Sequence, residues 1–132
     1  MKETTEEWVA KAESDYDLAR LAMEARDTPI VEGVCFHSQQ CVEKYLKAFL
    51  QERGVRFAPA HPLDPLLKLC LTVDEEFETL RSDLEGLDLY AVRIRYPGMS
   101  ATDEMAKDGL ASATGVRLFV RGKLGLAEQD SD

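Results

Sequence analysis

The sequence has few residues of the kinds that build metal centres and disulfide frameworks. It contains only two histidines and three cysteines among 132 residues. Cys35, Cys41 and Cys70 are odd in number, form no Cys-x-x-Cys pair, and each lies among apolar residues. We therefore expect buried free thiols in a reducing cytoplasm, and we predict no metal site.

Long apolar runs and targeting signals are also missing. No stretch approaches the roughly 20 apolar residues of a membrane span. Residues 1–7 lack the apolar core of a signal peptide. We therefore expect a cytoplasmic protein without membrane association. The net charge of −9 argues against broad binding to nucleic acids or anionic membranes, although it leaves room for a local basic pocket.

Signals for β-structure and for several enzyme classes are missing as well. No run of alternating β-branched residues occurs, and Asp108-Gly109 lies within helical patterning rather than at a hairpin turn. The sequence has no Walker A loop and no GxGxxG, GxSxG or HExxH motif. With 132 residues, 45% of them hydrophobic, the chain predicts one domain over 1–132, with a core at about 5–124.

Apolar residues recur at three- and four-residue steps along most of the chain, which predicts helices. Thr4 and Glu7 indicate a capping box, Thr28-Pro29 indicates a second helix start, and Gly54 indicates its end. We expect helices at about 4–26, 29–53, 66–71, 74–84 and 102–123, with 87–96 either a short helix or a loop. The predicted fold is all-α, an antiparallel up-and-down bundle of four main helices plus a short one.

The stretch 34–50 is the most informative, because one helix there carries two kinds of face. The core-facing stripe consists of Val34, Cys41, Tyr45, Ala48 and Phe49. The polar row beside it consists of His37, Gln40, Lys44 and Lys47. We expect the charges of this helix to be exposed, with Glu43 and Lys47 as a supportive pair four residues apart. The polar row has to meet a partner chain, an anionic ligand or water.

A second group of interest is Arg93-Ile94-Arg95-Tyr96-Pro97. Arginine can grip phosphate oxygens through two hydrogen bonds, and tyrosine can stack on a base. This group therefore indicates a contact to a nucleotide or to RNA phosphate. The alternative is that Arg95 ties a loop to a helix carboxylate such as Glu43, with Tyr96 packed on the core.

The order of these motifs resembles the HEPN domain, the higher eukaryote and prokaryote nucleotide-binding domain. Residues 8–21 resemble its opening helix, and 36–48 closely resemble its signature second helix. Residues 60–63, Ala-His-Pro-Leu, resemble the family's Thr-His-Asp-Leu, and 95–97 resemble its Arg-Tyr-Pro. The resemblance implies a helical bundle that commonly dimerises, binds nucleotides, and pairs with a minimal nucleotidyltransferase encoded nearby, as in toxin–antitoxin pairs.

One branch of that family cuts RNA without metal, using an Arg and a His that are separated by four to six residues and meet at a dimer seam. This chain departs from that branch, because no histidine follows Arg93 or Arg95. Arg56 and His61 match the spacing, but they lie in the loop before the third helix. His61 could instead cap the next turn while Arg56 is solvated. His37 is another candidate base, and it would need a nearby cation such as Lys44 or Arg95.

Three functions follow from these observations. The leading interpretation is a dimeric module that binds a nucleotide such as ATP, or a nucleotidyltransferase partner, without chemistry of its own. The first alternative is a metal-independent ribonuclease toxin, and the second is a purely structural dimer. The candidate ligand-binding residues are Arg93, Arg95, Tyr96, Gln40, Lys44 and Lys47. The candidate catalytic residues are His37, His61 and Arg56.

Overall fold

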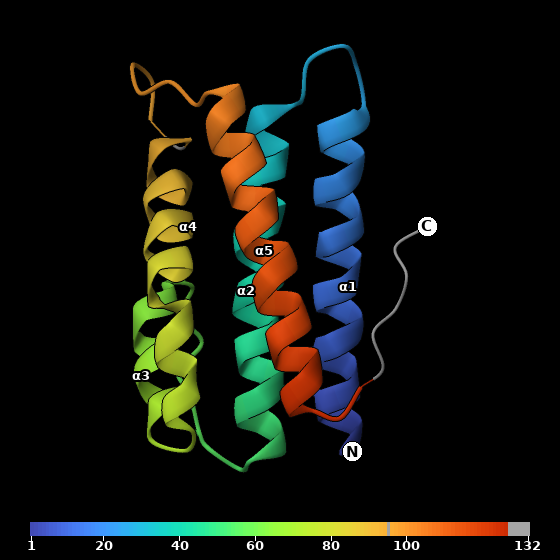
Figure 1. The fold of residues 1–132 in the computed structure, drawn as a ribbon, viewed down its shortest axis with the longest axis vertical. Coiled ribbons are helices and arrows are strands. Elements are labelled where there is room, and N and C mark those ends of the chain that lie inside the picture. The colour runs from blue at the N-terminus through green and yellow to red at the C-terminus, as the bar shows by residue number, and fades with distance from the viewer. Residues whose placement is uncertain (95, 127–132) are drawn as a thin grey trace.

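The fold is a bundle in which the four long helices alternate in direction along the chain (Figure 1). The computed structural model describes residues 1–94 and 96–126, and these form helices and no strand. The elements are α1 (Glu3–Glu24), α2 (Val31–Glu52), α3 (Leu63–Leu71), the 3-10 helix η1 (Glu75–Leu80), α4 (Arg81–Arg93) and α5 (Asp103–Lys123). The four long helices stand side by side, and short α3 packs against α2 and α4 (Figure 1). The predicted all-α bundle of four main helices plus a short one is therefore confirmed.

The second helix, α2, lies at the centre of the bundle. It packs most extensively against α1 and α5, and it also contacts α3 and α4. As a result, 14 of its 22 residues are buried. The predicted core stripe is confirmed, because all five of its members are fully buried. The expectation that Glu43 and Lys47 are exposed is wrong, since they are only 2% and 5% accessible. Neighbouring helices cover both faces of α2, so part of its polar row is enclosed.

Aromatic residues from three elements meet in the main core. Phe77 of η1 contacts Phe49 of α2 with ring centroids 4.4 Å apart, and it contacts Phe119 of α5 at 5.0 Å. Burying one such side chain stabilises the fold by about 1.5–3 kcal/mol. None of the described helices has the length and apolar character needed to cross a membrane.

All three cysteines are buried free thiols, as the sequence predicts. Burial, with a smaller contribution from the charge of Glu32, raises the pKa of Cys35 to about 11. Burial alone raises the pKa of Cys70 to about 12. A raised pKa keeps a thiol protonated, and the thiolate is the reactive form. These thiols therefore act as small apolar core residues.

Two helix starts differ from the sequence prediction because contacts between helices replace local caps. The capping box at Thr4 is absent, and α1 begins at Glu3 without a side-chain cap. Thr5, the next residue, is buried and donates its hydroxyl to Glu52 Oε1 at 2.9 Å, which joins the start of α1 to the end of α2.

The second helix likewise does not begin at Thr28-Pro29. It begins at Val31, and its N-cap Ile30 provides no side-chain hydrogen bond. The Ile30 amide instead donates to the carbonyl of Ala22 in α1, at 2.9 Å. The first helix accordingly ends at Glu24.

The region from 56 to 94 is more helical than predicted. The third helix begins at Leu63, whose amide donates to Asp88 Oδ2 at 2.9 Å. Pro65 lies in the first turn, where a missing amide hydrogen costs little. The single helix expected at 74–84 is instead η1 followed by α4, and the ambiguous stretch 87–96 is helical as far as Arg93.

Two other boundaries match their predictions. The second helix ends just before Gly54, which has a φ of 71°, a conformation that favours glycine. Thr102 caps α5 by accepting a hydrogen bond from the Met105 amide at 3.2 Å.

A charged network crosses the bundle from α1 to α5. Arg117 donates two hydrogen bonds to Glu13, at 2.6 and 2.8 Å. Tyr45 of α2 also donates to Glu13, and Arg121 donates to the Tyr45 hydroxyl at 3.2 Å. Burial alone would raise the pKa of Glu13. The hydrogen bonds from Arg117 and Tyr45 and the two arginine charges outweigh burial and hold that pKa below its usual 4.5.

This network predicts a pH-dependent contribution to stability. Because the pKa of Glu13 is lower in the folded chain, ionised Glu13 contributes stability above pH 4.5, and that contribution is lost as pH falls through the folded-state pKa. We expect Glu13→Gln to reduce the slope of unfolding free energy against pH below 4.5, measured by urea denaturation. Glu7→Gln, exposed on the same helix, is the control. Equal slopes in wild type and Glu13→Gln would contradict the prediction.

Candidate functional site

Two sets of side chains with the same composition lie along one polar stripe of α2. Each set contains one buried carboxylate that holds a histidine and a lysine. The first set consists of Asp15, His37 and Lys44. The second set consists of Glu43, His61 and Lys47. We call these six residues, together with Gln40, the α2 polar face.

The first set joins α1 to α2. Asp15 is only 6% accessible, and its two oxygens have different partners. One lies 2.8 Å from His37 Nδ1, and the other lies 2.5 Å from the Lys44 ammonium. A carboxylate can only accept, so it selects the imidazole tautomer with hydrogen on Nδ1 and leaves the lone pair on Nε2. The edge of the Phe36 ring packs on the imidazole, with centroids 5.1 Å apart.

The second set joins α2 to the loop before α3. Glu43 accepts from Lys47 at 2.8 Å and from Gln40 at 3.2 Å, and its Oε1 lies 3.0 Å from His61 Nδ1. The Lys47 ammonium also lies over the rings of Trp8 and Phe57, 5.3 and 5.8 Å from their centroids. Such cation–π contacts further stabilise a desolvated ammonium. Lys47 is therefore enclosed, whereas the side chain of His61 is 67% accessible.

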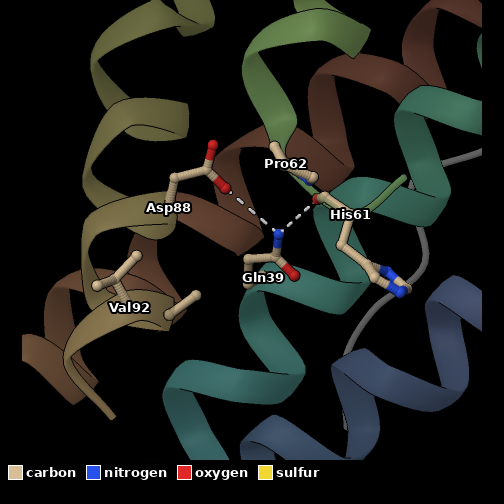
Figure 2. Close-up of a pocket in the computed structure, with 6 residues that line it drawn as sticks. Gln39, His61, Pro62, Asp88 and Val92 are labelled. Carbon is tan, nitrogen blue, oxygen red and sulfur yellow. Dashed lines mark hydrogen bonds between the residues drawn. The ribbon is translucent and has the colours of Figure 1, made fainter. Parts of the chain in front are cut away.

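A pocket of about 310 Å³ adjoins the second set, between α2, α4 and the loop before α3. Gln39 lies at its centre and donates to the His61 carbonyl at 2.9 Å and to Asp88 Oδ1 at 3.3 Å (Figure 2). Its own oxygen accepts from Gln40 at 2.9 Å. Apolar atoms of Pro62, Ala91 and Val92 complete the wall. The imidazole of His61 points away from Val92 (Figure 2), and its Nδ1 faces Glu43 of the α2 polar face.

The structure places the predicted residues of α2 and the third-helix loop as follows. His37, Gln40, Lys44 and Lys47 lie in the α2 polar face, and His61 joins them through Glu43. Arg56 does not join them. It is exposed and borders a separate hollow formed with Gln51, Gly54, Val55 and Phe57. The expectation that His61 caps α3 is wrong, because Asp88 accepts the Leu63 amide.

The predicted group after α4 is only partly described. Arg93 is exposed at the end of α4, and its Nη1 lies 3.9 Å from the Met105 sulfur. Tyr96 is 59% accessible, so the alternative in which it packs on the core is wrong. Arg95 lies outside the described residues. Glu43, the carboxylate suggested for Arg95, is held by Gln40, Lys47 and His61.

Sequence reasoning missed Asp15, Gln39 and Asp88. Asp15 carried a usable signal, because it shares a helical face with Ala12 and Ala19 of the core, and a carboxylate on such a face needs a partner. Gln39 and Asp88 carried none, since their roles depend on how α2, α3 and α4 pack. The described residues contain no group of three His, Cys, Asp or Glu side chains that could hold a metal ion.

Known proteins share this arrangement of helices. The family model of the HEPN domain matches residues 5–123. The chain is 26% identical to ST0689, an archaeal HEPN homologue, with a TM-score of 0.72 over 94% of this chain and 99% of that one. It is 25% identical to TT1696 from Thermus thermophilus, with a TM-score of 0.75 over 92% and 99% of the two chains. No curated protein matches the sequence.

Two lysine–carboxylate pairs at i,i+4 spacing, one buried and one exposed, allow a test of how burial changes the effect of an ion pair on stability. Lys47–Glu43 is buried at 2.8 Å, whereas Lys68–Asp64 is exposed at 3.0 Å. We expect Lys47→Met to lower the unfolding free energy by about 3–5 kcal/mol, because it leaves Glu43 without its enclosed cation. Lys68→Met, the matched control, should have little measurable effect.

Adding Glu43→Gln to Lys47→Met should restore part of the loss, because no buried charge is then left unpaired. Urea denaturation measures all three variants. Equal losses for Lys47→Met and Lys68→Met would show that the buried pair has no special weight.

Proposed function

Since this chain belongs to the HEPN domain family, we propose that it is a nucleotide-binding module whose ligand enters the pocket between α2, α4 and the loop before α3. One observation carries the proposal. The pocket combines apolar walls with a fixed polar pair, Gln39 and Asp88, and its volume of about 310 Å³ is at the small end of ligand pockets. That size suits a base with its sugar rather than a large ligand.

The lining of the pocket has the chemistry that a base requires. Pro62, Ala91 and Val92 offer apolar surfaces to the faces of a planar ring. Each Asp88 oxygen accepts one hydrogen bond within the protein, from Gln39 or from the Leu63 amide, and keeps a second lone pair. We propose that an Asp88 oxygen accepts a hydrogen bond from the amino group of the base. Gln39 fixes the position of Asp88 by linking it to the His61 carbonyl.

The phosphates of such a ligand need cations near the rim. Arg93 directly follows the wall residue Val92 and is exposed, and Arg95 and Tyr96 follow Ile94 in the sequence. We propose that the arginines grip the phosphates and that Tyr96 stacks on the ligand. Gln40 and Lys44 extend the polar surface beyond His61. Lys47 supports the site from within by neutralising Glu43, with no contact to the ligand.

We also propose a homodimer and a nucleotidyltransferase partner, both consistent with family membership. Several large apolar side chains are exposed and available for contacts between chains. They include Leu18, Leu21 and Phe36, on α1 and α2. Sedimentation analysis would measure the dimer, and a purely structural dimer would sediment as a dimer while binding no nucleotide.

The pocket can be tested by filling it. We expect Val92→Trp to weaken binding of ATP by about tenfold or more in calorimetric titration, because the indole would occupy the space of the base. Leu89→Trp is the matched control, since Leu89 is also exposed on α4 but lies outside the pocket. Absence of ATP binding to the wild type, or equal affinities in both variants, would refute the proposed site.

A metal-independent ribonuclease is a second candidate function, favoured by one observation. Both histidines have Nδ1 at a buried carboxylate, so each presents Nε2 in a fixed orientation, and Lys44 shares the carboxylate of His37. One histidine could remove the 2′-hydroxyl proton, the other could protonate the leaving oxygen, and Lys44 could stabilise the phosphorane.

This candidate predicts RNA cleavage in the presence of EDTA. We expect His37→Ala and His61→Ala each to slow cleavage by about a hundredfold or more, because each removes one proton-transfer group. Arg56→Ala should have no effect, since Arg56 lies outside the α2 polar face. RNA that stays intact with concentrated wild-type protein would exclude the ribonuclease.

A further inference from the structure

We propose that His37 is a phosphoryl-acceptor residue, prepared as a nucleophile by Asp15 and Lys44. The donor would carry phosphorus on an acyl-phosphate or phosphoramidate leaving group. The proposal goes beyond nucleotide binding and does not depend on it, because none of these three residues lines the pocket at Gln39.

Asp15 supplies the orientation that a nucleophilic imidazole needs. Its oxygen lies 2.8 Å from Nδ1, and the carboxylate is almost withdrawn from water. The hydrogen is therefore held on Nδ1, and the lone pair of Nε2 is available. Among the described residues, Nε2 has no hydrogen-bond partner that would compete for that lone pair. The Phe36 ring restricts rotation of the imidazole from one side.

Lys44 supplies the positive charge that an incoming phosphoryl group needs. Its ammonium binds the second oxygen of Asp15, so it is held beside the histidine by the same carboxylate. The side chains of Lys44 and His37 are 22% and 27% accessible, which leaves both in reach of a ligand at the surface. Partial burial strengthens the attraction between this ammonium and a phosphate.

The second set differs in the accessibility of its lysine. His61 also has a carboxylate at Nδ1, but the ammonium of that set, Lys47, is enclosed by Trp8 and Phe57. It cannot approach a phosphoryl group on His61. Lys44 instead binds Asp15, the carboxylate that also holds His37, whereas His61 is held by Glu43. The shared carboxylate therefore places Lys44 with His37 and not with His61.

The transfer step is balanced without any other reactant. The Nε2 lone pair forms a bond to phosphorus, and the bond from phosphorus to the donor's oxygen or nitrogen breaks with its electron pair. An acyl phosphate leaves as a carboxylate, and phosphoramidate, protonated on nitrogen, leaves as ammonia. The hydrogen stays on Nδ1, so the phosphorylated ring carries a positive charge that Asp15 neutralises.

Potassium phosphoramidate is the probe, and the two histidines of the chain allow a direct comparison. His61→Asn leaves His37 alone, and His37→Asn leaves His61 alone. In the folded protein we expect His37 to be labelled about tenfold faster than His61, with phosphorus on Nε2. In concentrated urea, where the neighbours are lost, we expect the two histidines to be labelled at similar rates. Intact mass and ³¹P NMR give the rate and the position. Accessibility alone predicts the opposite order, because His61 is far more exposed.

Two further variants test the roles of the neighbours in the His61→Asn background. Asp15→Asn and Lys44→Met should each slow labelling of His37 by about tenfold. Lys11→Met, which removes an exposed lysine of α1, should not change the rate. Circular dichroism checks that each variant is folded. If Asp15→Asn does not fold, the comparison of Lys44→Met with Lys11→Met decides. Labelling of His61 at an equal or higher rate, or an unchanged rate in Lys44→Met, would overturn the proposal.

Discussion

Two carboxylates, Asp15 of α1 and Glu43 of α2, lie almost out of water, and the charge of each has to be neutralised by a neighbouring side chain. An unpaired buried charge costs several kcal/mol, which is comparable to the net unfolding free energy of a typical domain. Asp15 is neutralised by Lys44 and also hydrogen-bonds His37, and Glu43 is neutralised by Lys47 and also hydrogen-bonds His61. These pairings fix α1 against α2, and they fix the loop before α3 against α2. The bundle and the polar face thus share one constraint.

The same constraint gives the surface its chemical character. A buried carboxylate also orients the side chains that bind it. Each histidine therefore has a defined outward nitrogen, and each lysine has a defined position. The lysines of the two sets then differ in burial. Lys47 lies under two rings and serves stability, whereas Lys44 remains in reach of a ligand. Similar residues thereby acquire different roles.

Gln39 and Gln40 connect the α2 polar face to the proposed nucleotide pocket. Gln40 donates to both Gln39 and Glu43, and Gln39 donates toward Asp88 on α4. A ligand in the pocket would therefore contact a hydrogen-bond chain that reaches the carboxylate of the second set. Charge-assisted bonds within such a chain make it rigid. This rigidity suits recognition of a small ligand with few contacts.

Periodicity in the sequence is enough to predict the helices, the core stripe of α2 and the polar row at His37, Gln40 and Lys44, because it depends on the geometry of a single helix. Which charges are buried, and which carboxylates face the histidines, depends instead on how the helices pack against one another. The pairing of Asp15 with His37, the burial of Lys47 and the link from Gln39 to Asp88 each depend on how two helices are aligned. The helix starts predicted at Thr4 and Thr28 failed for the same reason, since contacts between α1 and α2 replaced the local caps there.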